Sequence, residues 1–209
     1  MKRTLLALAL STLTLPIAAH AEQAAHVGGL SYTYIEAGYA RVDFDGIEVD
    51  HHSRAVDFSG RFLRGSVELG ESFYLFGGYV SGDNDDFGVD IDFNQLQAGV
   101  GYRFGLSEHV DLLSEISYLK EEIDISGHSP EKEDGYRASV GVRGLLTDRL
   151  EGFVKANYTR LKADGHEAKT SFGGTVAAEF LLNHTWRLVG EVGISKDVSE
   201  YAVGVRAAF

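Results

Sequence analysis

Arginine and glutamate side chains recur among the polar residues and glycines that occupy every second position along segments whose intervening residues are largely apolar or aromatic. Such alternation places the charges on one face of a strand, where an enclosed charge without a partner is too costly to persist. We therefore expect these charges to pair with one another and to plug the inside of a closed sheet. The alternative is a pore, in which the same charges form an ion-selective constriction. The predicted lumen network comprises Glu36, Arg64, Glu68, Arg103, Glu115, Arg137, Arg143, Glu151, Lys155, Glu179, Arg187, Glu191 and Arg206.

A second group of candidate residues is acidic and lies mostly between the alternating segments. Asp83, Asp85 and Asp86 carry the oxygen ligands that Ca²⁺ prefers, but Phe87 stands where a calcium loop needs another oxygen. The favoured interpretation is a solvated acidic rim, and the alternatives are cation bridging to lipopolysaccharide phosphates or attraction of a basic partner. The acidic groups are Asp43, Asp45, Glu48 and Asp50; Asp83, Asp85, Asp86, Asp90 and Asp92; and Glu121, Glu122, Asp124, Glu131, Glu133 and Asp134.

Histidines near acidic residues are the remaining candidates for catalysis. His51, His52, His128, Ser129 and His166 lie in predicted loops, where a histidine can activate a hydroxyl group or water. No fixed motif links them, and the absence of cysteine excludes thiolate metal sites and a cysteine nucleophile. We predict no catalytic residue, no metal and no cofactor, and a lipid A-modifying enzyme is the least favoured alternative.

Strands must position these side chains, because the apolar pattern has a period of two from about Leu30 onward. We predict an all-β, up-and-down antiparallel transmembrane barrel of ten strands, with eight as the alternative count. Tight turns alternate with mostly longer or more acidic connections, and the tight ones are assigned to the periplasm. The predicted strands are 30–44, 54–69, 73–82, 88–104, 110–125, 135–146, 150–161, 169–180, 186–195 and 201–209.

Alternation alone also fits a soluble antiparallel sandwich, so the ends of the apolar faces have to decide. Aromatic residues occupy these ends. Eight steps of about 3.3 Å, tilted by about 40°, give a height of roughly 20 Å, close to the apolar band of an outer-membrane barrel. The predicted membrane-interface aromatics are Tyr102, Tyr118, Tyr136, Tyr158, Phe172, Phe180 and Trp186.

The first 21 residues have the order of an export signal. Lys2 and Arg3 precede an apolar stretch, and Ala19-His20-Ala21 supplies the small-x-small cleavage pattern. We expect cleavage after Ala21 and a barrel domain over residues 22–209. Beyond the signal no apolar run is long enough for a membrane-spanning helix, and the net charge of -12 argues against a nucleic-acid partner.

The last predicted strand carries Tyr201, Val203, Val205, Ala207 and Phe209 at alternate positions. This pattern resembles the C-terminal signature by which the barrel-assembly machinery recognises outer-membrane barrels. The resemblance implies insertion by that machinery, with periplasmic chaperones as earlier partners. The whole predicted barrel domain looks like the small outer-membrane barrels of the OmpX/Ail class and the transmembrane domain of outer-membrane protein A.

A narrower resemblance rests on Leu30 to Tyr39, Phe76 to Tyr79 and Val100 to Ser107. These segments look like the sulfation-dependent quorum factor family of small outer-membrane proteins from plant-associated Gram-negative bacteria, with departures at Ala37 and Ala40. The family name implies a signalling or host-recognition role. We expect a non-enzymatic barrel in contact with outer-membrane lipid and lipopolysaccharide, serving envelope integrity, adhesion or recognition of an unidentified surface ligand. A narrow, porin-like channel is the alternative.

Overall fold

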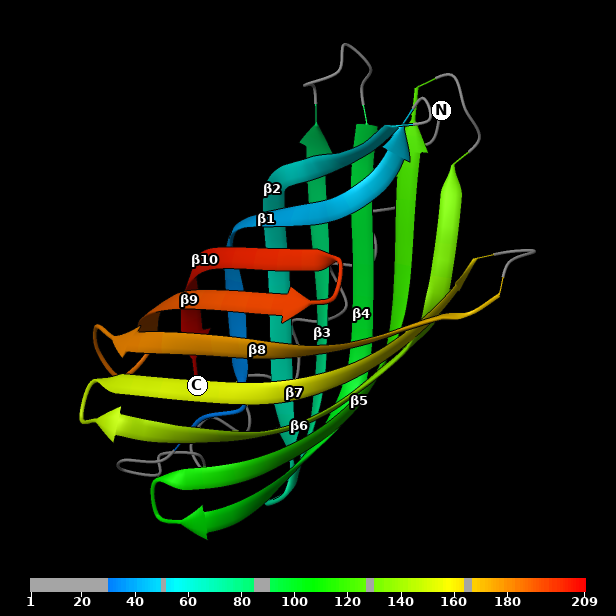
Figure 1. Ribbon diagram of the computed structural model, residues 1–209. Coiled ribbons are helices and arrows are strands. Elements are labelled where there is room, and N and C mark those ends of the chain that lie inside the picture. Colours follow the sequence, from blue (N-terminus) through cyan, green and yellow to red (C-terminus); the bar gives the residue numbers. More distant parts are fainter. Residues whose placement is uncertain (1–29, 50–51, 85–90, 127–129, 164–166) are drawn as a thin grey trace, which may run out of the picture.

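A computed structural model describes residues 30–49, 52–84, 91–126, 130–163 and 167–209. Within them, ten antiparallel strands form a closed barrel, in which each strand pairs with its neighbours in sequence and the last pairs with the first (Figure 1). The strands are β1 (Tyr34–Val49), β2 (His52–Leu69), β3 (Phe73–Asn84), β4 (Ile91–Ser107), β5 (Val110–Ile125), β6 (Glu131–Thr147), β7 (Leu150–Ala163), β8 (Lys169–Leu181), β9 (Trp186–Ser195) and β10 (Val198–Ala208). The predicted fold class and the count of ten are confirmed, and the alternative of eight is wrong.

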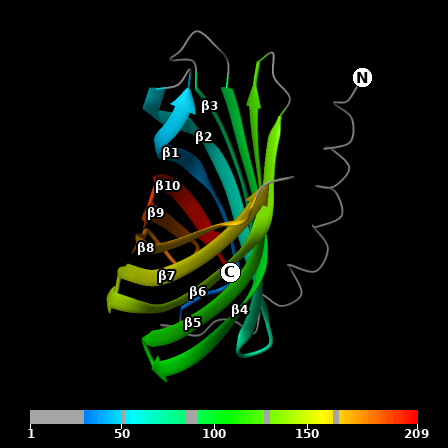
Figure 2. The same cartoon turned by 45° about the vertical axis from the view of Figure 1, so that its right-hand side comes forward.

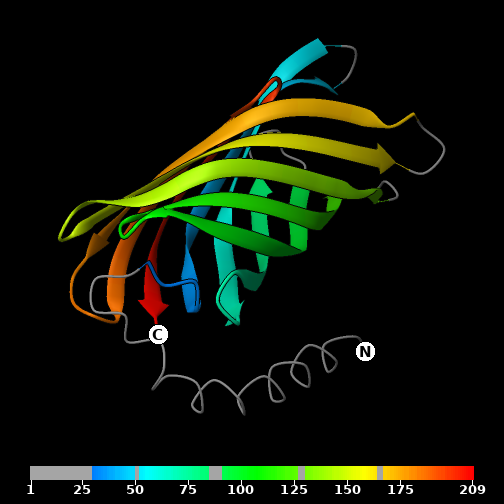
Figure 3. The same cartoon turned by 90° about the horizontal axis from the view of Figure 1, so that it is seen from below.

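Closure depends on the pairing of β1 with β10, which runs without interruption from Tyr34 opposite Ala208 to Phe44 opposite Val198. The carboxyl end of β10 therefore lies beside the start of β1 (Figure 3). β3, β4 and β5 cross β8, β9 and β10 steeply across the barrel in Figure 1, as tilted strands on opposite walls do. None of the described residues belongs to a helix long and apolar enough to cross a membrane.

The alternation separates an apolar outer surface from an enclosed interior. Leu63, Val176 and Val203 have exposed fractions of 45%, 55% and 65% on the outside, whereas Phe62 and Ala177, their neighbours in sequence, are buried inside. Exposing an apolar surface of this extent to water would be unfavourable, because burial of apolar area is the main driving force of folding in water. The outer surface is therefore suited to lipid.

Several strands extend farther than the sequence pattern predicted. The acidic segment Glu131–Asp134 belongs to β6, because its residues pair with β5. Glu131 pairs with Ile123, and Asp134 pairs with Lys120. β1 and β2 likewise continue toward each other until Val49 pairs with His52. Conversely, residues 30–33, which the alternation assigned to the first strand, precede β1. Neighbouring strands thus supply ladder hydrogen bonds even where charged residues weaken strand propensity.

The barrel interior is also less uniformly polar than the alternation suggested. At the end of the lumen remote from the carboxyl terminus, buried apolar side chains form a cluster, against which Phe44, Ile123, Ile125 and Val198 pack. Phe58 and Phe93 stack at its centre with ring centroids 5.5 Å apart. The buried members are Val42, Val56, Phe58, Ile91 and Phe93. This apolar cluster lines the inner faces of β1, β2, β4 and β5 at that end of the lumen.

Close strand contact at Gly60 gives a testable requirement. A Cβ atom at Gly60 would overlap the carbonyl oxygen of Ser81 on β3, whereas a Cβ atom at Gly190 would meet no other atom within 4 Å. We expect Gly60→Ala to lower the free energy of unfolding by about 1–3 kcal/mol, a typical cost of overpacking, and Gly190→Ala to leave it nearly unchanged. Urea unfolding in lipid vesicles measures both. Equal stability of the two variants would contradict the close pairing of β2 and β3.

Candidate functional site in the barrel lumen

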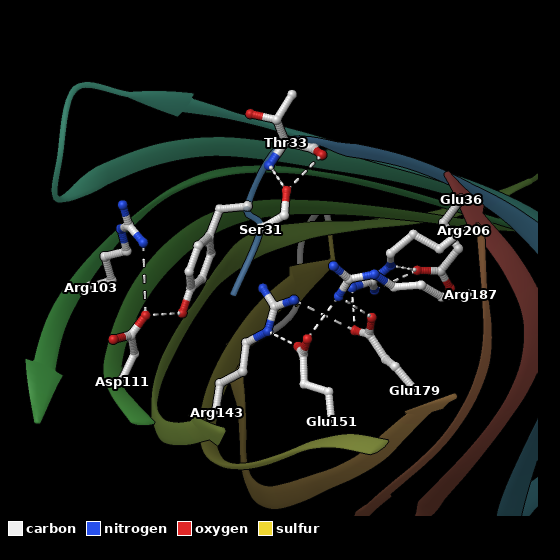
Figure 4. Close-up of polar contacts among 11 residues, drawn as sticks. Ser31, Thr33, Glu36, Arg103, Asp111, Arg143, Glu151, Glu179, Arg187 and Arg206 are labelled. Carbon is white, nitrogen blue, oxygen red and sulfur yellow. Dashed lines mark hydrogen bonds and ion pairs between the residues drawn. The ribbon is translucent and has the colours of Figure 1, made fainter. Parts of the chain in front are cut away.

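Six charged side chains form a buried layer near the end of the lumen where the chain terminates (Figure 4). None is more than 5% exposed. They come from four parts of the barrel wall: β1, the β6–β7 hairpin, β8 and the β9–β10 hairpin. The charged layer consists of Glu36, Arg143, Glu151, Glu179, Arg187 and Arg206.

Glu179 is the centre of this charged layer. One of its carboxylate oxygens accepts a hydrogen bond from Arg206 and lies 3.8 Å from Nη2 of Arg143, and the other accepts from Nη1 of Arg187 at 3.3 Å. Glu151 pairs with Arg143 and accepts from Nη1 of Arg187 at 2.7 Å. Three guanidinium groups thus share three carboxylates, since Glu36 completes the set by accepting from Nε of Arg206 at 2.9 Å. Each charge is compensated within the layer, as its burial requires.

The segment before β1 adds a second obstruction at the same end. Tyr32 is 2% exposed, and its hydroxyl group donates to Asp111 at 2.8 Å. Its ring lies 4.5 Å from the guanidinium carbon of Arg143 and 5.0 Å from that of Arg103, within cation–π range on both. Ser31 donates to the carbonyl oxygen of Phe209 at 2.8 Å, which ties the segment to the end of the chain. Residues 30–33, called the N-terminal strap below, therefore fold into the lumen.

Farther from the carboxyl-terminal end of the lumen, next to the charged layer, the interior contains more ion pairs, but these pack less tightly. Arg64 donates to Glu191 at 2.9 Å, and Lys155 donates to Glu115 at 3.0 Å. These four residues line a cavity of about 130 Å³ together with tyrosine, serine and amide side chains. A water molecule occupies about 30 Å³ in the liquid, so this central cavity has room for about four waters.

A second, smaller cavity of about 40 Å³ lies along the inner faces of β6 to β10, toward the end of the lumen away from the charged layer. Arg137 and Glu200 line both cavities and approach to 3.9 Å. Arg137 also donates from Nε to Thr159 at 3.0 Å. At Val198 of β10 this outer cavity adjoins the apolar cluster, whose buried members lie on β1, β2 and β4.

All thirteen charges of the predicted lumen network lie on inward faces, and each belongs to an ion pair. Their partners include two acids outside the prediction, since Arg103 contacts Asp111 at 3.9 Å and Arg137 contacts Glu200 at 3.9 Å. Tyr32 and Tyr74 were also missed as lumen residues. The alternation in the sequence could have placed Tyr32 and Glu200 in the lumen. Tyr32 is an even number of residues from Glu36, as Glu200 is from Arg206, so each has the phase of a predicted lumen charge.

The predicted interface aromatics fall into two groups. Tyr102, Phe180 and Trp186 lie near the end of the barrel that holds the charged layer. Toward the other end, the ring of Tyr158 lies 6.2 Å from that of Tyr136 and 5.2 Å from that of Phe172. Tyr118 pairs directly with Tyr136 across β5 and β6. Each group forms a partial belt on the outer surface, although Tyr158 itself is half-buried.

The C-terminal pattern is placed on the outer surface with one exception. Tyr201, Val203, Val205 and Phe209 are exposed, whereas Ala207 is only 6% exposed. Ala207 lies between Ile35 of β1 and Trp186 of β9, whose larger side chains flank its methyl group.

Most of the candidate catalytic and metal-binding residues lie outside the described part of the chain. This applies to Asp85, Asp86, His51, His128, Ser129 and His166, and only the backbone of His52 is described. Among the described residues, no group of three or more histidine, aspartate or glutamate side chains is arranged to hold a metal ion.

A closed antiparallel barrel with an apolar outside and paired charges inside defines the class of outer-membrane barrels. The profile of the outer membrane protein beta-barrel domain family matches residues 5–180, and the chain belongs to this family. The protein is accordingly located in the outer membrane. No curated protein matches the chain.

Three solved structures illustrate the likeness. Ail of Yersinia pestis, solved with the heparin analogue sucrose octasulfate, has 14% identity and a TM-score of 0.45 over 85% of this chain and 97% of its own. Neisserial surface protein A has 16% identity and a TM-score of 0.45, with coverages of 86% and 98%. The KdgM porin, in complex with disordered oligogalacturonate, has 13% identity and a TM-score of 0.44, with coverages of 84% and 99%. The resemblance to the quorum-factor family is tested by none of these matches and stays a prediction.

The central position of Glu179 predicts a large cost for removing its charge. Glu179→Gln leaves three buried guanidinium groups with two carboxylates, and breaking a buried ion pair typically costs about 3–5 kcal/mol. The matched control is Glu133→Gln, since Glu133 pairs with Lys169, whose side chain is 79% exposed, and such pairs contribute less than about 1 kcal/mol. Unfolding in urea should separate the two variants clearly. Equal stability would show that the charged layer does not hold the barrel together.

Proposed function

We propose that the protein is a closed, non-enzymatic outer-membrane barrel that serves the envelope and the cell surface rather than transport. The buried charged layer is the observation that carries this proposal. A conducting pore needs a continuous wet path with weakly held charges, whereas Glu179 is 0% exposed and bonded on both oxygens. The N-terminal strap supports the same conclusion, because Tyr32 fills the space between Arg103 and Arg143.

The outer surface supports the proposed membrane placement. We infer that the two partial aromatic belts lie at the two membrane interfaces, where amphipathic rings are favoured. The charged layer then lies toward the periplasm, because it is at the end of the barrel where tight turns such as residues 70–72 join the strands, and short turns of such barrels face the periplasm. The pattern that ends in Phe209 supports insertion by the barrel-assembly machinery with chaperone assistance, and cleavage after Ala21 would precede it.

A row of carboxylates supports a role at the cell surface. Asp83, Asp92 and Asp124 are directly opposite one another across β3, β4 and β5, and all three are exposed. Directly opposed like charges destabilise a sheet, so this acidic row costs stability. Its retention is accounted for by attraction of basic groups on a surface partner or of bridging divalent cations.

A narrow channel is the competing function, and the central cavity is the observation in its favour. Reconstitution in planar bilayers distinguishes the two. We expect no steady openings from the intact protein, and we expect openings from the double variant Tyr32→Ala/Arg143→Ala, which removes the strap ring and one guanidinium of the charged layer. Steady, ion-selective openings of the intact protein would establish the channel and refute the closed barrel.

The acidic row makes a separate prediction about binding. Replacing Asp83, Asp92 and Asp124 with asparagine should weaken attachment of protein-producing cells to polylysine-coated surfaces, especially at low salt, where exposed charges are least screened. It should also raise barrel stability slightly, because like-charge repulsion is removed. The control replaces three exposed acids in turns at the other end, Glu71, Glu108 and Asp148, with their amides. Unchanged attachment of the first variant would remove the proposed role of the row.

A further inference from the structure

The two cavities share part of their walls. Arg137, Asn157, Thr175 and Glu200 line both the central cavity and the outer cavity. The outer cavity also reaches Ser171, Ser195 and Val198, which lie beside the hairpin ends of β8, β9 and β10. Arg137 and Glu200 approach each other as an ion pair at this shared wall, and among the described residues that line both cavities they form the only such pair.

The Arg137–Glu200 contact is one of the loosest ion pairs in the described lumen. Its 3.9 Å separation compares with 2.9 Å for Arg64 and Glu191 just below it. Side-chain exposures of 21% and 35% show that both groups reach solvent. A solvent-exposed pair at this distance contributes little free energy, so its two side chains separate at low cost.

The apolar cluster lies mainly on the other side of the lumen. Its buried members come from β1, β2 and β4, with partly buried residues from β5 and β10 packed against it. The outer cavity lies along β6 to β10, and hydroxyl, amide and glycine residues line most of it, together with Arg137 and Glu200. Ile194 and Val198 complete its wall, and Val198 also packs against the apolar cluster. β9 and β10, which contribute residues to this cavity, are shorter than β8 and β1 and lie side by side in Figure 2.

Below the cavities the charged layer interrupts the path. On the inner face of β6, Arg137, Ser139 and Arg143 all line the central cavity. Arg143 is 4% exposed and also belongs to the charged layer, which therefore forms the floor of this cavity. On β8, Thr175 lines both cavities, whereas Ala177, the next inward residue, is 5% exposed.

We propose that the upper lumen is a blind pocket, open only to the cell surface past the Arg137–Glu200 pair, which admits small uncharged solutes that form hydrogen bonds. Uncharged solutes are favoured because the charges deeper in the wall already pair with each other, as Arg64 does with Glu191 and Lys155 with Glu115. An entering ion would lose hydration without gaining an unpaired partner. The volume of about 130 Å³ limits the solute to a small molecule. Entry of solutes into the pocket does not imply that ions cross the barrel, since the charged layer lies beneath the pocket.

Single cysteines test this pocket, because the chain contains none. Ser139→Cys places a nearly isosteric thiol below the Arg137–Glu200 pair, and Thr175→Cys provides a second position in case the first variant does not fold. Ala177→Cys reports on the charged layer, and Ser126→Cys on an exposed outer position. Each variant is first shown to be folded by its heat-dependent migration on gels. Intact cells are then treated with an uncharged hydroxyethyl or an anionic sulfonatoethyl methanethiosulfonate, which forms a mixed disulfide with the thiol and releases methanesulfinate.

We expect both reagents to modify Ser126→Cys and neither to modify Ala177→Cys. At Ser139→Cys and Thr175→Cys, the uncharged reagent should react at least about tenfold faster than the anionic one. Adding Arg137→Ala to Ser139→Cys should accelerate modification, because it removes one side of the pair. Folded Ser139→Cys and Thr175→Cys proteins that both resist the uncharged reagent would overturn the pocket. Modification of Ala177→Cys at the rate of Ser139→Cys would show instead that the lumen is not blind, and an unchanged rate with Arg137→Ala would overturn the assignment of the entrance.

Discussion

Closure of the backbone ladder between β1 and β10 is the constraint on which the rest of the molecule depends. A membrane interior offers no water to an unpaired strand edge, where each unmatched N–H or C=O group costs several kcal/mol. Closing the sheet removes the edges, and it also forces every second side chain into a narrow enclosed space. The composition of that space then follows from electrostatics, because an enclosed arginine such as Arg206 requires a carboxylate within reach.

The lumen satisfies this requirement in layers of different character. At one end, Glu179 and its neighbours form a buried layer of ion pairs, and the strap residue Tyr32 packs against Arg143. At the other end, apolar side chains around Phe58 and Phe93 exclude water from one side of the interior. The pairs between these layers enclose space rather than filling it. The described lumen is therefore tightly packed at the charged layer and contains a polar cavity farther along.

Much of this arrangement follows from the alternation in the sequence, because a period of two fixes the face on which each strand residue lies. Arg143, Glu151 and Glu179 could be placed in the lumen in this way, since they are out of phase with the valines and aromatics around them. Which charges meet could not be predicted, because the partners come from strands far apart in sequence, as with Glu36 and Arg206. The apolar cluster was missed for a different reason. Parity places Phe58 on the same face as Arg64, and Phe93 on the same face as Arg103, but the apolar type of these residues is the one expected of lipid-facing positions. The strap was taken as part of the first strand because Tyr32 has the same parity as Glu36.

Amide hydrogen exchange of the protein in lipid nanodiscs tests the central claim of closure most directly. If β1 and β10 pair as they do in the structure, the amides of Ala37 to Val42 and of Glu200 to Val205 that bond across this seam will exchange as slowly as those of the β5–β6 pair, which lies on another part of the wall. Rapid exchange confined to β1 and β10 would mean that the sheet has free edges. The barrel, its enclosed charges and the functions derived from them would then be contradicted together.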